Sequence, residues 1–243
     1  MSRKNKILHF LYVLVILALI ATVITLSVYL KKAQEPCEAN MQDVQKYRQG
    51  KNTTYAFENL NFSKGQIVFL GDSNTDLCHL DDFFADLDLA TYNRGVGADT
   101  TNEVLGRLKT SVIDIAPSKV VLMIGTNDVN AGSELPDILE NYREIIRQIK
   151  EALPDTEIYC MSVIPLGELI NDRVDINKNN PIIVSLNTEI KALCDADETL
   201  TYFDLHSLVK DESGLLASKY TDDGIHLNNA GFAVWSELIK PYL

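Results

Sequence analysis

Compact apolar segments alternate with amphipathic helical patterns from residue 66 to the C-terminus, and this alternation restricts the fold more than any other feature of the chain. The segments are rich in β-branched and aromatic residues and span residues 66–70, 89–93, 119–124, 156–164 and 200–203. Between them, apolar residues recur every three or four positions, as in the stripe of Leu105, Leu108, Val112 and Ile115. Strands that are apolar along their whole length are typical of a parallel sheet covered by helices on both faces. The sequence therefore predicts an α/β domain with a five-stranded parallel sheet.

The beginning of the chain follows a different pattern. Residues 7–30 contain no Asp, Glu, Lys or Arg, and as a helix they would reach roughly 36 Å, enough to cross a hydrocarbon core of about 30 Å. A cleaved signal peptide is the alternative. Its apolar region is shorter, about 7–15 residues, and ends in a small-residue cleavage site that is missing here. We therefore predict that residues 1–30 form a cytoplasmic stub and one transmembrane signal-anchor helix.

The charges beside this segment predict its orientation. Three basic side chains and the N-terminal amine precede it, whereas Lys31 and Lys32 follow it. Positive charge is enriched on the cytoplasmic side of membrane helices. The expected location is therefore the cell membrane, with a single pass and with residues 31–243 on the extracellular side.

The remainder of the chain is strongly acidic. It carries all 34 Asp and Glu residues and 19 of the 22 Lys and Arg residues, a net formal charge of −15. A nucleic-acid partner would need a basic face, and the sequence has no basic cluster that could form one. Residues 31–64 are polar with few periodic apolar positions, which predicts a stalk or linker. Residues 65–243 are long enough for one domain with a substantial core.

The four cysteines do not resemble a disulfide framework. Cys37, Cys78, Cys160 and Cys194 form no Cys-x-x-Cys pair, and Cys160 lies in a strand-like segment where it is typical of a small core residue. One extracellular disulfide remains open, because the sequence assigns no pairing.

Polar residues follow the first apolar segment in the motif Gly71-Asp72-Ser73-Asn74-Thr75. Glycine permits a tight turn there, and Ser73 would begin the next helix. The backbone N–H of Ser73 would then have no helical acceptor and could stabilise a negatively charged oxygen. An ordinary helix N-cap is the alternative interpretation of Ser73.

Two further segments of the same kind follow the next two strands. Residues 93–101 contain small residues that permit close approach of a ligand, and Asp99 or Thr100 could cap the next helix. Residues 125–128 place Asn127 at a strand end, where an amide can donate to a developing oxyanion. A plain strand-to-helix turn and an Asx turn are the respective alternatives.

A fourth segment near the C-terminus contains Asp223 and His226. A carboxylate three residues before a histidine in a short loop can orient the ring and fix its tautomer. The main competing histidine is His206, two residues after Asp204. That pair could ligate a metal, but no third ligand cluster accompanies it.

In this order and at these strand ends, the four segments resemble the GDSL/SGNH hydrolase superfamily from about residue 66 to the C-terminus. The resemblance implies a three-layer α/β/α flavodoxin-like fold and ester hydrolysis without a metal or organic cofactor. Carried over by position, Ser73 is the nucleophile, and Asp223 and His226 complete the triad. The oxyanion hole consists of the N–H groups of Ser73 and Ala98 and the amide of Asn127. The Gly-x-Ser-x-Gly elbow of the α/β-hydrolases is absent.

One position departs from the pattern of the superfamily. Relatives that have Gly-Asp-Thr in the second segment place a glycine N–H in the oxyanion hole, and this chain has Ala98 there. Alanine keeps the donor but penalises a positive φ.

The resulting expectation is a membrane-anchored extracellular serine ester hydrolase that forms an acyl-enzyme on Ser73. Its expected partners are small-molecule, lipid or glycan esters of carboxylic acids. Short acyl groups are favoured, because no long apolar lid is visible in the sequence. An O-acyltransferase acting on cell-envelope glycans and a catalytically silent binding module are the alternatives.

Overall fold

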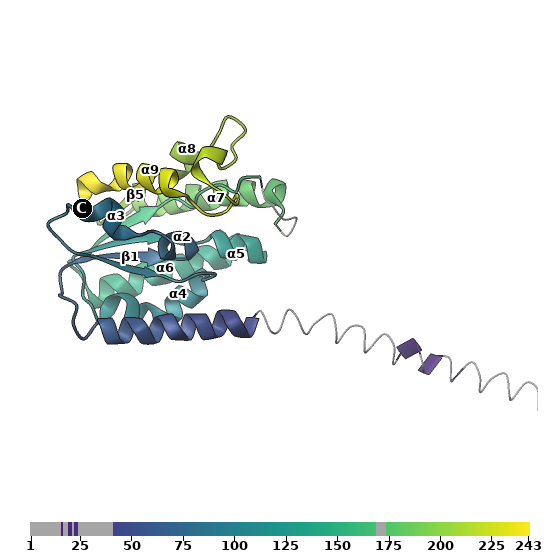
Figure 1. Cartoon of the computed structure of the whole chain (residues 1–243), viewed down its shortest axis with the longest axis horizontal. Coiled ribbons are helices and arrows are strands. Elements are labelled where there is room, and N and C mark those ends of the chain that lie inside the picture. Colours follow the sequence, from purple (N-terminus) through teal and green to yellow (C-terminus); the bar gives the residue numbers. More distant parts are fainter. Residues whose placement is uncertain (1–15, 17–18, 21, 24–40, 169–173) are drawn as a thin grey trace, which may run out of the picture. The chain divides into compact units, whose positions relative to one another are not determined.

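The computed structural model describes residues 16, 19–20, 22–23, 41–168 and 174–243. The chain divides into two units, Met1–Tyr47 and Arg48–Leu243. In the first unit, the described residues are helical. The second unit contains the sheet and all of the labelled helices (Figure 1).

Five parallel strands form one sheet with the order β2-β1-β3-β4-β5, as the sequence predicts. The strands are β1 (Ile67–Gly71), β2 (Thr91–Gly95), β3 (Lys119–Met123), β4 (Glu157–Met161) and β5 (Leu200–Phe203). Gly71 at the end of β1 lies level with Gly95 of β2 and with Met123 of β3. The three strands therefore end at one edge, where ligands of open α/β sheets bind.

The helices follow the strands in regular alternation. They are α2 (Ser73–Asp76), α3 (Leu80–Phe84), α4 (Thr101–Leu108), the π-helix η1 (Lys109–Ile113), α5 (Thr126–Ala131), α6 (Leu135–Ala152), α7 (Ile176–Asp195), α8 (Leu205–Val209), the 3₁₀ helix η2 (Ser218–Tyr220), α9 (Asn229–Ile239) and the 3₁₀ helix η3 (Lys240–Tyr242).

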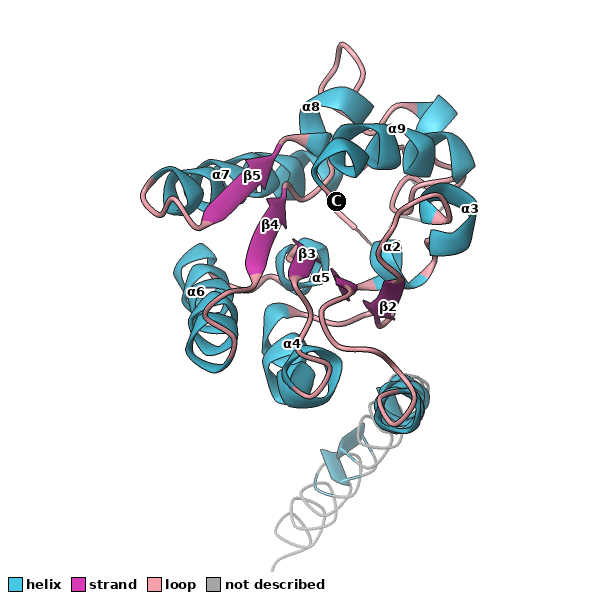
Figure 2. Cartoon of the chain, turned by 90° about the vertical axis from the view of Figure 1, so that its left-hand side faces the viewer, coloured by secondary structure: helices cyan, strands magenta, loops and turns pink. Residues whose placement is uncertain are grey.

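Each face of the sheet is buried under its own layer of helices (Figure 2). Val68 and Leu70 of β1 belong to a core shared with α4, α6 and α7. Ile67 and Phe69 belong to a second core that contains Trp235 of α9. Side chains alternate between the two faces of a strand, so a strand inside a three-layer fold is apolar along its whole length. The expected α/β/α layering is confirmed.

The fourth strand is shorter than the predicted segment 156–164, because side chains of α7 replace the sheet as hydrogen-bond partners. The N–H of Val163 donates to Asn187 Oδ1 at 2.7 Å, and its carbonyl accepts from Asn187 Nδ2 at 2.8 Å. Leu166 is held by Asn180 in the same way. The backbone groups of Val163 and Leu166 are therefore satisfied outside the ladder.

Residues 48–64 differ from the polar stalk that we expected over 31–64. Residues 48–58 are helical and belong to the same compact unit as the sheet. Tyr55 is buried, and its hydroxyl donates to the carbonyl of Gly95 at 2.5 Å. The guanidinium of Arg94 lies 4.3 Å from the centre of the Tyr55 ring. This helix packs through single aromatic and charged side chains, so it lacks the apolar stripe that identifies most packed helices.

The predicted transmembrane helix falls mainly outside the described residues. Of residues 1–30, only 16, 19–20 and 22–23 are described, and they are helical with exposed side chains. Within the part of the chain that the structure describes, no helix is long and apolar enough to cross a membrane. Cys37 also lies outside the described residues, whereas Cys78, Cys160 and Cys194 are buried free thiols.

Candidate active site

The predicted site residues come from the carboxyl edge of the sheet and from the loop before α9. Ser73 begins α2 directly after β1, and its side chain is half-buried. The helix is capped by the residue before it, because Asp72 Oδ1 accepts from the N–H of Asn74 at 3.0 Å. Ser73 is therefore not the N-cap, which was the alternative interpretation. Within the described residues its own N–H donates to no backbone acceptor.

Ser73, His226 and Asp223 form one hydrogen-bonded chain. His226 Nε2 lies 2.9 Å from Ser73 Oγ, and His226 Nδ1 lies 2.6 Å from Asp223 Oδ2. When Nδ1 carries the proton and donates to the carboxylate, Nε2 is left as an acceptor for the serine hydroxyl. Side chains from two distant parts of the sequence thus meet in the order expected for a nucleophile, a base and an orienting acid.

The loop that carries Asp223 and His226 is fixed largely by its own backbone. Asp223 Oδ1 accepts from the N–H groups of Ile225 and His226, both at 2.8 Å. Burial acts to raise the pKa of Asp223, but these hydrogen bonds and the His226 ring outweigh it and hold the pKa below its usual range. The carboxylate is therefore ionised and available to the imidazole at neutral pH.

Asn74 joins this loop to the nucleophile helix. Its Oδ1 accepts from the N–H of Leu227 at 2.9 Å, and its Nδ2 donates to the carbonyl of Ile225 at 3.4 Å. Both contacts span 151 or more positions of the sequence. The residue after Ser73 thus fixes the distance between the serine and the histidine, a role that no sequence pattern indicated.

Asp72 is a buried carboxyl beside the nucleophile. Only 2% of its surface is exposed. Burial raises the pKa of Asp72 to about 7, against the opposing effects of the Asn74 hydrogen bond and the charge of His226. The structure assigns it a capping role at the start of α2.

Ala98 adopts the backbone conformation that its identity disfavours. Its φ is +63°, in the left-handed region. Within the described residues, its N–H donates to no backbone acceptor, whereas its neighbour Gly97 donates to Asp76 Oδ2 at 3.0 Å. The expected donor is therefore available despite the alanine. Left-handed geometry costs a non-glycine residue roughly 1–2 kcal/mol, which the surrounding contacts must offset.

Asn127 stands at the beginning of α5, after β3, as the sequence predicts. Its Nδ2 donates to the carbonyl of Asp99 at 2.9 Å, and a primary amide has a second N–H to offer. The next residue, Asp128, contacts the start of α4: both of its oxygens accept from the N–H of Thr101, 27 positions away, at 3.0–3.1 Å. Asn127 is thus tied to the loop that carries Ala98.

Arg107 is a further residue of this edge that the sequence did not identify. It is buried and donates to the carbonyls of Gly71 and Arg94, both at 2.9 Å, and to Asp99 Oδ2 at 2.6 Å. One guanidinium therefore joins the ends of β1 and β2 to the Ala98 loop, defined here as residues 96–100. The apolar stripe of α4 predicted which face of the helix is buried, but not the contacts of Arg107.

Asp204 and His206, the pair considered above as possible metal ligands, lie at the start of α8. Asp204 caps α8 by accepting from the N–H of Ser207 at 3.1 Å, and His206 is buried. Among the described residues, no group of three or more His, Cys, Asp and Glu side chains could hold a metal ion.

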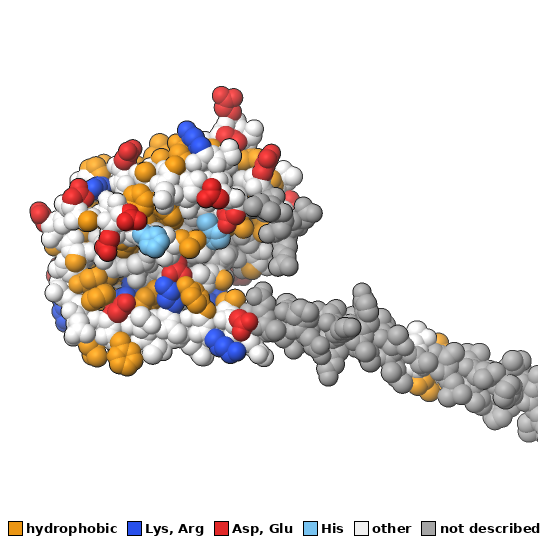
Figure 3. Space-filling model, in the orientation of Figure 1, with side chains coloured by type: hydrophobic (Ala, Val, Ile, Leu, Met, Phe, Trp, Pro, Cys, Tyr) orange, Lys and Arg blue, Asp and Glu red, His pale blue; other side chains and the backbone are white. Residues whose placement is uncertain are grey.

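A pocket of about 580 Å³ opens beside His226. Leu77 and Phe232 line it together with His79, Asp222 and the triad histidine. On this face of the molecule, histidine side chains reach the surface among acidic and apolar groups (Figure 3). The pocket is large enough for a small ester group beside His226, and Ser73 is not among the residues that line it.

This combination of fold and site defines a class of hydrolase that uses a serine, a histidine and a carboxylate on a parallel α/β sheet. The model of the GDSL-like Lipase/Acylhydrolase family matches residues 69–234, and the chain belongs to this family. It is a hydrolase of the GDSL type.

Three similar proteins illustrate the family. The platelet-activating factor acetylhydrolase IB subunit alpha1 of Pongo abelii is 25% identical over 171 residues, covering 69% of this chain and 71% of that protein. A solved structure from Streptococcus pneumonia, whose description names platelet activating factor, is 26% identical with a TM-score of 0.78 and covers 84% and 96% of the two chains. A GDSL-like lipase of Bacteroides thetaiotaomicron is 26% identical with a TM-score of 0.70, covering 78% and 95%.

Proposed function

We propose that this protein is a carboxylic ester hydrolase in which Ser73 attacks the ester carbonyl and forms an acyl-enzyme. The observation that carries the proposal is the continuous chain from Ser73 Oγ through the His226 ring to Asp223, with separations of 2.9 Å and 2.6 Å. This order of groups lets the histidine take the serine proton while the aspartate stabilises the imidazolium that forms.

The proton follows a closed path in this mechanism. It moves from Ser73 Oγ to His226 Nε2 as the Oγ–carbon bond forms, and then to the alcohol oxygen as the ester bond breaks. A water molecule next loses a proton to the same nitrogen and attacks the acyl carbon. The Oγ–carbon bond then breaks, the proton taken from water passes to Ser73 Oγ, and the carboxylic acid leaves. The N–H groups of Ser73 and Ala98 and the amide of Asn127 stabilise the oxyanion in both halves.

We further propose that the substrate carries a short acyl group. The pocket beside His226 is open and partly polar, and the Pongo abelii relative is named as an acetylhydrolase. Asp222 lines the pocket, and the chain has an excess of acidic residues. This charge favours an ester with a neutral or cationic alcohol part over one with an anionic alcohol part.

A panel of p-nitrophenyl esters from acetyl to palmitoyl tests the acyl preference directly. We expect kcat/KM to be highest for acetyl or butyryl and to fall for longer chains. A maximum at palmitoyl would contradict the short-acyl proposal. Assays with an acetylated donor and a glycan acceptor separate hydrolysis from transfer, and the hydrolase proposal fails if the acetyl group moves to the glycan faster than to water.

We also propose that the chain is held in the cell membrane with residues 31–243 outside. The support is the uncharged segment 7–30 and the excess of positive charge before it. Full-length protein should remain in the membrane fraction after alkaline carbonate washing and should be accessible to protease added to intact cells. Recovery in the medium, with a new N-terminus near residue 30, would show a cleaved signal peptide.

A further inference from the structure

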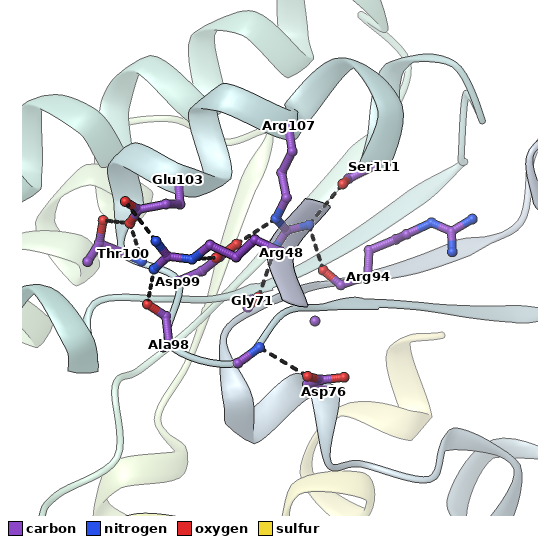
Figure 4. A network of polar contacts seen from close by, with 12 residues as sticks. Arg48, Gly71, Asp76, Arg94, Ala98, Asp99, Thr100, Glu103, Arg107 and Ser111 are labelled. Atoms are coloured by element: carbon purple, nitrogen blue, oxygen red, sulfur yellow. Dashed lines mark hydrogen bonds and ion pairs between the residues drawn. The ribbon is translucent and has the colours of Figure 1, made fainter. Parts of the chain in front are cut away.

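The helix of residues 48–58 directs Arg48 at the Ala98 loop (Figure 4). It also directs Lys51 at Asp76, a residue of α2 that contacts the same loop. Arg48 and Lys51 lie one helical turn apart, so they share a face of the helix. Tyr55, one further turn along, hydrogen-bonds to the end of β2. The helix is therefore docked at the base of the loop.

Arg48 binds the loop at two points and the following helix, α4, at a third. Its Nη2 donates to the carbonyl of Ala98, its Nε lies 2.9 Å from Asp99 Oδ1, and its Nη1 lies 3.3 Å from Glu103 Oε1. The side chain of Asp99 is 1% exposed and that of Arg48 is 24% exposed. An ion pair at this depth is screened less by solvent than a surface pair, and removal of one partner leaves a buried charge uncompensated.

Lys51 acts on the other side of the same loop through a carboxylate. Its Nζ lies 2.5 Å from Asp76 Oδ1, and Asp76 Oδ2 accepts from the N–H of Gly97 at 3.0 Å. Asp76 belongs to α2, the helix that Ser73 begins. Lys51 thus fixes a link between the nucleophile helix and the loop.

These contacts enclose the peptide unit that provides the Ala98 N–H. The preceding peptide is fixed through the N–H of Gly97, and the following peptide is fixed through the carbonyl of Ala98. Ala98 itself has a φ of +63°, which an alanine leaves readily unless its surroundings enforce it. Arg48 directly, and Lys51 through Asp76, therefore fix the peptide groups on both sides of the Ala98 N–H.

We propose that Arg48, assisted by Lys51, is a positioning residue that keeps the Ala98 N–H directed at the oxyanion. The inference rests on the proposed function and deepens it. It assigns a role in transition-state stabilisation to a helix that precedes the first strand and lies outside the residues matched by the family model. Arg48 touches neither the substrate nor Ser73 in this role and acts only through the loop.

The test compares Arg48→Gln with Arg147→Gln in the full-length protein. Arg147 is a matched control, because it is also a helical arginine paired with two carboxylates, Glu144 and Glu151, but it lies on α6. We expect Arg48→Gln to lower kcat by about 10–100-fold with KM changed less than about threefold, since misplacement of a catalytic group by about 1 Å costs that much. Arg147→Gln should keep the wild-type kcat.

A tetrahedral inhibitor separates positioning from general loss of structure. A trifluoromethyl ketone forms an oxyanion on the serine, so its Ki should rise for Arg48→Gln by about the same factor as kcat/KM falls. Arg48→Lys keeps the charge but not the three-point contact and should give an intermediate loss. It also replaces Arg48→Gln in the comparison if that variant does not fold.

The inference is overturned if the folded Arg48 variant has the wild-type kcat and Ki, or if KM alone changes. An equal loss in Arg147→Gln overturns it as well. Failure of the proposed function is recognised separately, because wild-type protein and Arg147→Gln would then both lack esterase activity.

Discussion

The two halves of the candidate site are built in opposite ways. The triad loop holds its own shape, because Asp223 accepts from two N–H groups within three positions of itself. The Ala98 loop depends on side chains from elsewhere, and its carbonyl contact with Arg48 spans 50 positions of the sequence. In the proposed mechanism, the first half provides the reacting groups, and the second provides donors for the charge that develops on the substrate.

This difference determines what each half tolerates. A loop that is fixed mainly by local hydrogen bonds should lose function when a reacting group is removed or when Asn74, which ties it to α2, is changed. A loop that is fixed by distant charges should lose function gradually when any of its supports is changed. The expected effects therefore differ in size between the two halves.

The largest effects are expected in the triad. Ser73→Ala or His226→Ala should lower kcat by about a million-fold, and the double variant should be scarcely worse, because residues that act as a unit are not additive. Asp223→Asn should cost about 10⁴-fold, since the ring loses its orienting charge. Steady-state kinetics on p-nitrophenyl acetate measures these losses. An active His226→Ala together with an inactive His206→Ala would refute the assignment of the base.

Intermediate effects are expected in the oxyanion hole. Asn127→Ala deletes a side-chain donor and should lower kcat by about 10²–10³-fold. Ala98→Pro deletes a backbone donor and should match or exceed that loss. Ala98→Gly keeps the N–H and suits the positive φ, so it should remain within about tenfold of wild type. Melting temperatures must accompany each assay, and a well-folded Ala98→Pro enzyme with normal kcat would show that the loop contributes no donor.

The smallest expected effect is on the free energy of unfolding. It arises from Asp72, whose carboxyl group takes no part in the proposed reaction. Burial raises its pKa from 3.8 to about 7, so the folded protein keeps a proton that the unfolded chain has released between about pH 4 and pH 7. The stability that Asp72 contributes is therefore full below pH 4 and is lost as the pH rises to 7. The side chain of Asp72→Asn stays neutral at every pH. As the pH rises through this range, the free energy of unfolding of the variant should therefore increase relative to that of wild type, by on the order of 1–3 kcal/mol. Urea unfolding at several pH values measures the difference, and parallel curves would contradict the prediction.

The sequence predicted the parts of the molecule that have local signatures. The five strands were predicted because each is apolar along its length. Ser73, Asp223 and His226 were proposed as a triad because their motifs resemble those of the GDSL/SGNH hydrolases, and the structure brings the three side chains together. The strands and the Asp223–His226 contact depend on neighbours within a few positions, as does the N-cap of α9, where Asn228 accepts from the N–H groups of Ala230 and Gly231.

The supports of the Ala98 loop could not be predicted in the same way. Arg48 and Lys51 lie in a polar segment without an apolar stripe, so the segment was interpreted as a stalk. Their partners, Asp99 and Asp76, come from different turns of the chain, and only the folded topology brings them together. Long-range pairing of charged side chains leaves no periodic pattern in the sequence.

The central claim is that Ser73 is the nucleophile activated by His226, and labelling with a fluorophosphonate tests it most directly. Intact-mass spectrometry and peptide mapping should find one adduct, on Ser73, in the wild-type protein. Ser73→Ala should acquire none, and His226→Ala should react far more slowly. A wild-type enzyme that hydrolyses esters while Ser73 remains unlabelled, or that carries its adduct on another residue, would contradict the account.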